Sequence, residues 1–309
     1  MSTAATTATN TTTATTTSST SSTTTDRRIP FPPHRPDGRT SHHTLRPLSC
    51  ELSTLSQSDG SALWKSGATH VLASVHGPLA PRQPHWETDH TLVSLLIKSG
   101  GLGASSSLGE QHHREWEDVL TKVVTGCLEA SSQRQRCVVQ IVLQIISADG
   151  SVLAACLHAA LSALMDAGLE LSYLPTAVTC RIINGSTVSS SSSSSSSSST
   201  SRCIQLDPTA EEEEDNDDDD NINNYGGGGT VVLFTNGSVD GDQETRTTTT
   251  SLHGTTILAC HTSGNLHLTI PVLLQCCAAA DQVRPALIAF WRLVMEQKVT
   301  REAQTLWSS

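Results

Sequence analysis

Residues 144–168 read Gln-Ile-Ile-Ser-Ala-Asp-Gly-Ser-Val-Leu-Ala-Ala-Cys-Leu-His-Ala-Ala-Leu-Ser-Ala-Leu-Met-Asp-Ala-Gly. They continue an apolar run that begins at Cys137 and predicts a strand buried on both faces. The tight turn Asp149-Gly150-Ser151 follows, and leucines at helical spacing then predict a helix over 152–167 with one apolar stripe. Gly168 stands where a glycine commonly ends a helix. Strand, turn and helix in this order form the best-defined unit of the sequence.

Extended segments precede this central unit. Apolar residues over 45–55 are spaced as in a half-buried strand, and residues 69–76 and 90–97 are rich in β-forming types. Asp59-Gly60 is a hairpin signal between Ser56 and the apolar residues 62–64. These features predict that the opening third of the chain is antiparallel β.

A loop and a helix are expected next, and a second group of strands after the central unit. Gly and Ser dominate residues 98–113, and helical spacing predicts a helix from Arg114 to about Ala130. Four later strands are expected at residues 177–183, 203–206, 230–234 and 255–260. A long final helix contains Pro285, which is expected to kink it or split it in two. The fold class predicted is α+β, with expanded loops.

Three low-complexity tracts interrupt this pattern. Residues 1–25 hold 14 Thr and 5 Ser, residues 189–199 are eleven consecutive serines, and residues 211–220 hold nine acidic groups. Such tracts bury too little apolar surface to offset the entropy of ordering them. We therefore expect a disordered Ser/Thr-rich tail over 1–34 and one domain over 35–309, with low-complexity inserts at about 184–201 and 210–229.

The net charge of −11 belongs mainly to one of these tracts. The chain has 30 acidic and 19 basic residues, and removing the nine acids of residues 211–220 leaves 21 against 19, a net charge of −2. A near-neutral remainder argues against a free-standing RNA-binding module, because such modules usually carry a basic face.

Other classes of protein are also disfavoured. No apolar run approaches the ~20 residues that span a bilayer, and no charged-then-apolar signal opens the chain, so we expect no membrane association. The nine cysteines show no C-x-x-C spacing and mostly lie in apolar stretches, which favours buried thiols in a reducing compartment over disulfides or zinc.

The turn before the central helix carries the most informative candidate chemistry. Backbone N–H groups at Gly150 and Ser151 would suit a phosphate or another anion, but the next residue is Val152 and not a cation. A Ser N-cap on a core helix needs no ligand, and the residues alone favour this simpler interpretation.

Lys98 and Arg114 could contact a nucleic-acid backbone, although charge density favours a solvated loop. No metal site is expected, because the acidic run lacks a rigid frame and the histidine pairs lack helical spacing.

Several spaced motifs resemble the RNase PH family. They are Arg35-Pro36-Asp37-Gly38-Arg39 with Leu45-Arg46-Pro47-Leu48, Asp59-Gly60-Ser61-Ala62, residues 67–78 and residues 144–168. The resemblance covers about residues 35–309 outside the low-complexity inserts. It implies a βαβα fold like the second domain of ribosomal protein S5, six-membered rings around a channel for RNA, and cleavage of RNA 3′ ends with inorganic phosphate in the active members.

This chain departs from the family pattern at three places. Active members hold phosphate at a Gly-Ser/Thr-Arg turn, and here Val152 stands where the arginine is expected. They carry arginines in the helix before the central strand, where this chain has acidic residues at 115, 117 and 118. Their catalytic acid follows a Leu-Asp pair, seen here as Leu206-Asp207, but Pro208-Thr209 and the acidic insert come next, and no carboxylate there is expected to be held in a fixed place.

The resemblance and its departures together predict a non-catalytic subunit of the RNA exosome core ring, with no cofactor. The implied partners are other RNase PH-like exosome subunits, S1/KH cap subunits and RNA in the ring channel. The implied location is the nucleus, including the nucleolus, and the cytoplasm. The alternative is a phosphorolytic 3′-to-5′ exoribonuclease that acts alone or as a homo-oligomer.

Overall fold

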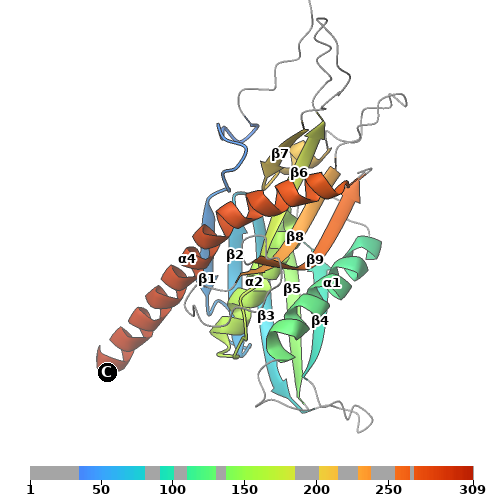
Figure 1. The fold of residues 1–309 in the computed structure, drawn as a ribbon. Helices are drawn as coiled ribbons and strands as arrows, with labels where there is room; N and C mark the ends of the chain where they lie inside the picture. Colours follow the sequence, from blue (N-terminus) through green and yellow to red (C-terminus); the bar gives the residue numbers. More distant parts are fainter. Residues whose placement is uncertain are drawn as a thin grey trace, which may run out of the picture. The chain divides into compact units, whose positions relative to one another are not determined.

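Two β-sheets and the helices packed on them make up the described part of the chain (Figure 1). The computed structural model describes residues 35–80, 91–100, 110–129, 137–184, 202–214, 229–237, 255–264 and 268–308. The elements are β1 (Leu48–Leu52), β2 (Gly60–Ser66), β3 (Thr69–Leu79), β4 (Leu92–Ser99), α1 (Glu110–Glu129), β5 (Val138–Ser147), α2 (Val152–Asp166), β6 (Thr176–Asn184), β7 (Arg202–Leu206), α3 (Ala210–Glu214), β8 (Gly229–Gly237), β9 (Thr255–Gly264) and α4 (Ile270–Ser308). The predicted tail, the serine run and most of the acidic insert lie outside the described residues.

The first sheet has the strand order β1-β2-β3-β5-β4. Strands β1, β2, β3 and β5 pair antiparallel, and the predicted hairpin signal Asp59-Gly60 lies at the connection from β1 to β2. The prediction of a wholly antiparallel opening third is wrong for β4, which pairs parallel with β5 from Leu92 opposite Val138 to Ser99 opposite Ile145. The cause is topological, because α1 carries the chain back across the sheet between β4 and β5 and two strands joined by such a crossover run parallel.

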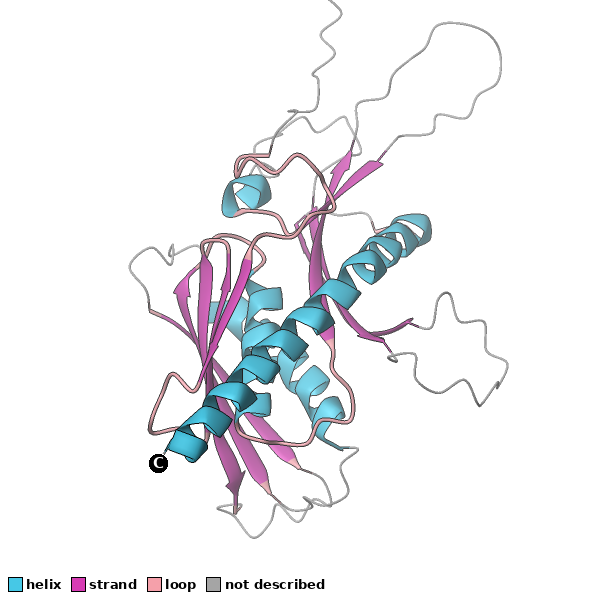
Figure 2. Ribbon diagram, turned by 90° about the vertical axis from the view of Figure 1, so that its left-hand side faces the viewer, coloured by secondary structure: helices cyan, strands magenta, loops and turns pink. Residues whose placement is uncertain are grey.

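The second sheet is antiparallel and has the order β7-β6-β8-β9. Helix α2 contacts strands of both sheets, and Figure 2 shows helices running between the two groups of strands. Every residue from Val152 to Leu164 is buried, so the prediction of a single apolar stripe is wrong. A helix that packs against a sheet on either side needs apolar or small residues all around, which the alanines supply.

The prediction that β5 is buried on both faces is also wrong. Its buried side chains alternate with more exposed ones, and Val139, Ile141, Leu143 and Ile145 are fully buried. Gln140, Gln144 and Ile146 point to the other face, where Ile146 is 39% exposed. The sheet therefore has one core face, which lies against α2.

Helix α4 is continuous from Ile270 to Ser308 and contains Pro285, so the predicted split does not occur. Buried contacts on both sides of the proline, at Val283 and Leu287, hold the two halves in one helix. By length and composition alone Ile270–Trp307 could cross a membrane, with a window of mean hydropathy 1.2 that is 33% buried. A core helix passes the same test, and α4 contacts β1, β6, β7 and β8, so the expectation of no membrane association stays a prediction.

An aromatic cluster joins α4 to the core. The ring centroids of Trp64 and Trp291 lie 4.9 Å and 5.2 Å, respectively, from that of His158 in α2. The Trp291 indole donates to Ser162 Oγ at 3.1 Å. Burial lowers the pKa of His158 to about 4, and its neutral ring accepts a hydrogen bond from the Ala177 amide at 3.2 Å. These uncharged side chains therefore pack β2, α2, β6 and α4 together.

A buried ion pair fixes the second half of α4 to the end of α2. Lys298 Nζ lies 2.7 Å from Asp166 Oδ1, and Asp166 also accepts hydrogen bonds from Ser53 Oγ and the Ser61 amide. We expect Lys298→Met to lower the free energy of unfolding by about 1–3 kcal/mol, because the Asp166 carboxylate stays buried without its cation. Urea unfolding measures this change.

The matched control is Lys65→Met, which removes a cation from the exposed pair with Glu51. This substitution should leave the unfolding curve unchanged, because water screens the pair. Equal effects of the two substitutions would contradict a structural role for Lys298.

Candidate functional site

The turn that joins β5 to α2 has a strained backbone. Gly150 has φ +72° and Ser151 has φ +52°, a left-handed conformation that is rare for a residue other than glycine. The Ser151 hydroxyl makes no cap to α2 and donates to the Pro208 carbonyl at 3.2 Å. The Ser N-cap interpretation is therefore wrong, because an N-cap residue needs a φ in the extended region to aim its oxygen at the first turn.

A second strained segment lies directly against this turn. Asp207, which follows β7, has φ +51°, and the short helix α3 begins three residues later. Thr209 and Glu212 form a capping box for α3: the Glu212 amide bonds Thr209 Oγ1, and the Thr209 amide bonds Glu212 Oε2 at 2.9 Å. A Cβ on Gly150 would lie 2.4 Å from the Pro208 carbonyl oxygen, so the two backbones touch.

Arg46 joins the two segments. Its guanidinium donates to Asp207 Oδ1 at 2.7 Å and to the Gly150 carbonyl at 3.1 Å, and it also bonds the Asp149 carbonyl. The Arg46 amide donates to Asp207 Oδ2 at 3.0 Å, and Thr69 Oγ1 bonds both Gly150 O and the Asp149 amide. The guanidinium is almost fully buried, so this is an interior polar cluster.

Two more arginines hold the same segment from the other side. Arg35 makes a bidentate pair with Glu212, at 2.8 Å and 2.7 Å, and donates to the carbonyls of Leu206 and Asp207. Arg39 donates to the Asp207 carbonyl at 2.8 Å. The opening motif of the sequence therefore lies against the end of β7. Its arginines donate hydrogen bonds to the backbone carbonyls there.

The carboxylates of this cluster have pKa values shifted in different directions. Burial alone would raise the pKa of Asp207, but the hydrogen bonds and charge of Arg46 outweigh it and leave the pKa below its ordinary value. Arg35 does the same for the pKa of Glu212. Burial raises the pKa of Glu213 to about 7, with added repulsion from Asp207 and Asp149. Glu213 is therefore the group of this cluster that titrates near neutral pH.

The side chain of Glu213, a residue of α3, reaches the start of α2, where an external anion would be expected to bind. Its Oε1 accepts a hydrogen bond from the Ser151 amide at 3.0 Å. Beside it, the apolar side chain of Val152 is 8% exposed and offers no cation. The amide at this turn thus already bonds a carboxylate of the same chain.

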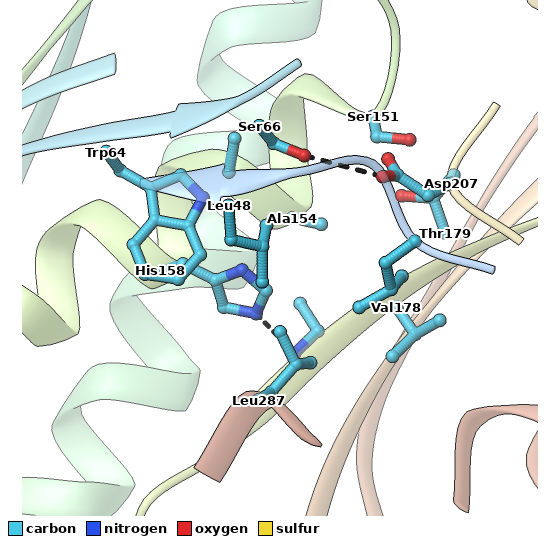
Figure 3. A pocket seen from close by; sticks show the side chains of 13 residues that line it. Leu48, Trp64, Ser66, Ser151, Ala154, His158, Val178, Thr179, Asp207 and Leu287 are labelled. Carbon is cyan, nitrogen blue, oxygen red and sulfur yellow. Dashed lines mark hydrogen bonds between the residues drawn. The ribbon is translucent and has the colours of Figure 1, made fainter. Parts of the chain in front are cut away.

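A small pocket extends from this cluster into the core (Figure 3). Ser66, Ser151 and Asp207 lie at its polar end, and Trp64, His158 and Leu287 line the rest. Its volume of about 20 Å³ accommodates about one water molecule and not a nucleotide. Within the part of the chain that the structure describes, no group of three His, Cys, Asp or Glu side chains is placed to hold a metal ion.

Comparisons with known proteins identify the first half of the fold. Residues 44–170 match the family model described as "3' exoribonuclease family, domain 1", which is the RNase PH family. Residues 44–170 therefore resemble an RNase PH domain. The resemblance noted in the sequence is thereby confirmed, and the turn, Arg46 and α2 all lie within the matched residues.

Curated relatives of the RNase PH domain include exosome proteins. The chain is 31% identical over 148 residues to "Exosome complex exonuclease RRP46 homolog" of Arabidopsis thaliana, a match that covers 47% of this chain and 58% of the relative. It is 31% identical to "Exosome complex component rrp46" of Schizosaccharomyces pombe over 44% of this chain and 58% of the relative. The matched region thus spans less than two thirds of these relatives.

Solved structures extend the likeness to both sheets. The crystal structure of rice Rrp46 matches with a TM-score of 0.60 at 21% identity and covers 84% of this chain and 98% of the rice chain. A chain of an archaeal exosome core matches with a TM-score of 0.54 at 19% identity, over 82% of this chain and 91% of that chain. The α+β, RNase PH-like fold class is confirmed.

The residues predicted for RNA contact lie on a strand and a helix. Lys98 is in β4 and Arg114 is in α1, which begins at Glu110, so the loop predicted over 98–113 is shorter than expected. Both side chains are exposed. Lys98 pairs in register with Gln144, near the end of β5. Since the two strands are parallel, β4 ends at the same edge of the sheet as β5, where the turn begins. Contact with RNA stays a prediction.

The acidic residues of α1 have structural partners. Glu117 Oε1 accepts a hydrogen bond from the Ile97 amide of the edge strand β4 at 2.7 Å, and Glu115 lies 3.9 Å from His261 of β9. They stand where active family members are expected to carry arginines, and Glu117 here bonds the edge strand β4.

The prediction that no carboxylate of the acidic insert is fixed is wrong. Glu212, at the head of the insert, is buried and ion-paired with Arg35, and Glu213 accepts a hydrogen bond from the Ser151 amide. The Thr-x-x-Glu pattern at 209–212 is a capping-box signal that would have placed a helix start at the head of the insert. The pairing of Arg35 with Glu212, 177 residues apart, leaves no local signal in the sequence.

The close contact at Gly150 generates a test of the turn. We expect Gly150→Ala to lower the free energy of unfolding by about 2–5 kcal/mol, because the new Cβ is strained at positive φ and meets the Pro208 carbonyl. The control is Gly38→Ala, which has φ +81° but open space around its Cβ and should cost about 1 kcal/mol. Thermal unfolding of both variants decides the point, and a Gly150 variant no less stable than the Gly38 variant would refute the contact.

Proposed function

We propose that this protein is a non-catalytic structural subunit of the RNA exosome core ring, which supports 3′-to-5′ RNA processing and degradation. Relatives named as RRP46 and RRP41 components of the exosome support the assignment to that complex. The observation that carries the non-catalytic role is Val152, which stands where the family pattern has a phosphate-binding arginine.

The charge of the turn argues against phosphate as a bound nucleophile. A phosphate needs cations and free N–H donors, and the Ser151 amide is bonded by Glu213. The only cation bonded to the turn within the described residues is Arg46, which is ion-paired with Asp207 and Asp149. An incoming dianion would therefore meet carboxylates at short range in a poorly solvated site, where repulsion is strong.

The proposed partners follow from the same assignment. They are other RNase PH-like exosome subunits, the S1/KH cap subunits, and RNA in the channel, with Lys98 and Arg114 as the proposed contacts to its backbone. The proposed location is the nucleus, with the nucleolus, and the cytoplasm. Salt-sensitive binding of RNA to the assembled complex should weaken when both cations are changed to alanine.

Affinity purification of the tagged full chain, followed by mass spectrometry, tests the assignment. We expect RNase PH-like and S1/KH subunits to co-purify in amounts similar to that of the tagged chain. A matched purification of the Asp207→Asn variant, which should lose the polar cluster, controls for capture that does not need the fold. Recovery of the folded wild-type chain without these subunits would overturn the proposal.

The second candidate is a phosphorolytic 3′-to-5′ exoribonuclease. It is favoured by the relatives that are named exonucleases and by the fixed positions of Asp207, Glu212 and Glu213. This candidate requires phosphate-dependent release of nucleoside diphosphates from RNA by the purified chain. We expect no release from the wild type or from Val152→Arg, and release by the wild type would establish the enzyme.

A further inference from the structure

Three carboxylates surround one guanidinium at the turn. Asp149 and Asp207 both form ion pairs with Arg46, at 3.4 Å and 2.7 Å. Glu213 enters from α3 and also feels the charge of Arg46 and of both aspartates. The neighbouring carboxylate of Glu212 is neutralised by Arg35. The three carboxylates therefore exceed the single cation when all are ionised, and a proton on one of them reduces this excess of negative charge.

Direct hydrogen bonds join the segment around α3 to the turn. Ser151 Oγ donates to the Pro208 carbonyl, the Ala210 amide donates to Asp149 Oδ1 at 3.3 Å, and the Ser151 amide donates to Glu213 Oε1. Two of these three bonds end on a carboxylate. The attachment of α3 to the turn therefore depends on the ionisation state of the cluster.

We propose that α3 is a pH-sensitive cap on the turn at Asp149–Ser151, held closed while Glu213 is protonated and loosened when Glu213 ionises. This inference concerns contacts within the chain and does not rest on membership of the exosome. It gives the head of the acidic segment a role that its composition alone does not suggest.

The direction of the pH dependence of closure follows from the groups that face Glu213. Desolvation by burial is the largest influence and raises its pKa, Asp207 and Asp149 raise it further, and the Ser151 amide and Arg46 lower it, so that the pKa lies at about 7. With the cap open, Glu213 would return to its ordinary value near 4.5. The closed state then binds more protons between these two values, so closure is strongest below about pH 4.5 and is lost progressively as the pH rises to 7.

The other carboxylates do not reverse this sign near neutral pH. The pKa of Asp207 is lowered, because Arg46 outweighs its burial, and the pKa of Glu212 is lowered by Arg35 in the same way. Both therefore stay ionised from about pH 5 upward. Glu213, with its pKa of about 7, changes its ionisation over that range.

Hydrogen exchange of the Ser151 amide in the full chain tests the proposal, since this amide is bonded by Glu213. After division by the intrinsic exchange rate, we expect opening to increase on the order of tenfold between pH 5.5 and 7.5. Glu213→Gln, which is nearly isosteric and does not ionise, should show opening that is independent of pH. Glu211→Gln, on the exposed side of the same helix, should behave like the wild type.

The Leu157 amide within α2 reports global opening in the same experiment. Constant protection there, with a pH-dependent Ser151 amide that becomes independent of pH in Glu213→Gln, would support the cap. The proposal is overturned if the wild-type Ser151 amide is independent of pH, if Glu213→Gln keeps the wild-type slope, or if Leu157 changes in parallel. None of these readouts depends on partner subunits or on nuclease activity, so the proposed function can fail separately.

Discussion

The buried ion pair between Arg46 and Asp207 holds three distant segments of the chain together. It joins residues 161 positions apart and brings the segment before β1, the turn before α2 and the end of β7 together. Asp207 adopts a left-handed backbone conformation, and the ion pair and the Thr179 carbonyl hold it there. Such a pair adds little net stability over an apolar contact, but removing one partner leaves a buried charge that costs about 3–5 kcal/mol. Its main effect is to fix which segments meet.

The same cluster also engages the arginines of the opening motif within the chain. The arginines of the opening motif bind backbone carbonyls and carboxylates of the chain itself, and none in the described cluster is left to neutralise a substrate phosphate at Ser151. Val152 packs as an apolar residue at the start of α2 and adds no cation there. The same polar cluster thus serves to dock segments in this protein.

The sequence predicted the local elements well where their pattern depends on near neighbours. The strand at 69–76 lies within β3, the helix over 152–167 is α2, and Gly168 takes the left-handed conformation expected at a helix end. Failures arose where distant elements decide the outcome. The parallel pairing of β4 depends on the path of α1, and the burial of α2 on every side depends on a second sheet formed by later strands.

The candidate site was predicted only in part for the same reason. Gly150, Ser151 and Val152 were located from their order in the chain, since the turn is local. The role of Glu213 was missed because composition hid it within an acidic run, and its contact with Ser151 spans 62 residues. Charge counts describe how acidic a segment is, whereas the ion pairs that fix Asp207 and Glu212 depend on tertiary structure.

The structural role of Asp207 is tested most directly by the Asp207→Asn variant. The free energy of unfolding and the phosphate-dependent release of nucleoside diphosphates from RNA are measured for the variant and for the wild type. The substitution keeps the size of the side chain and removes the charge that faces Arg46. The account predicts that the free energy of unfolding falls by about 3 kcal/mol, with no phosphate-dependent release of nucleoside diphosphates from either protein. Unchanged stability, together with a release activity that the wild type has and the variant lacks, would show that Asp207 serves catalysis and would contradict it.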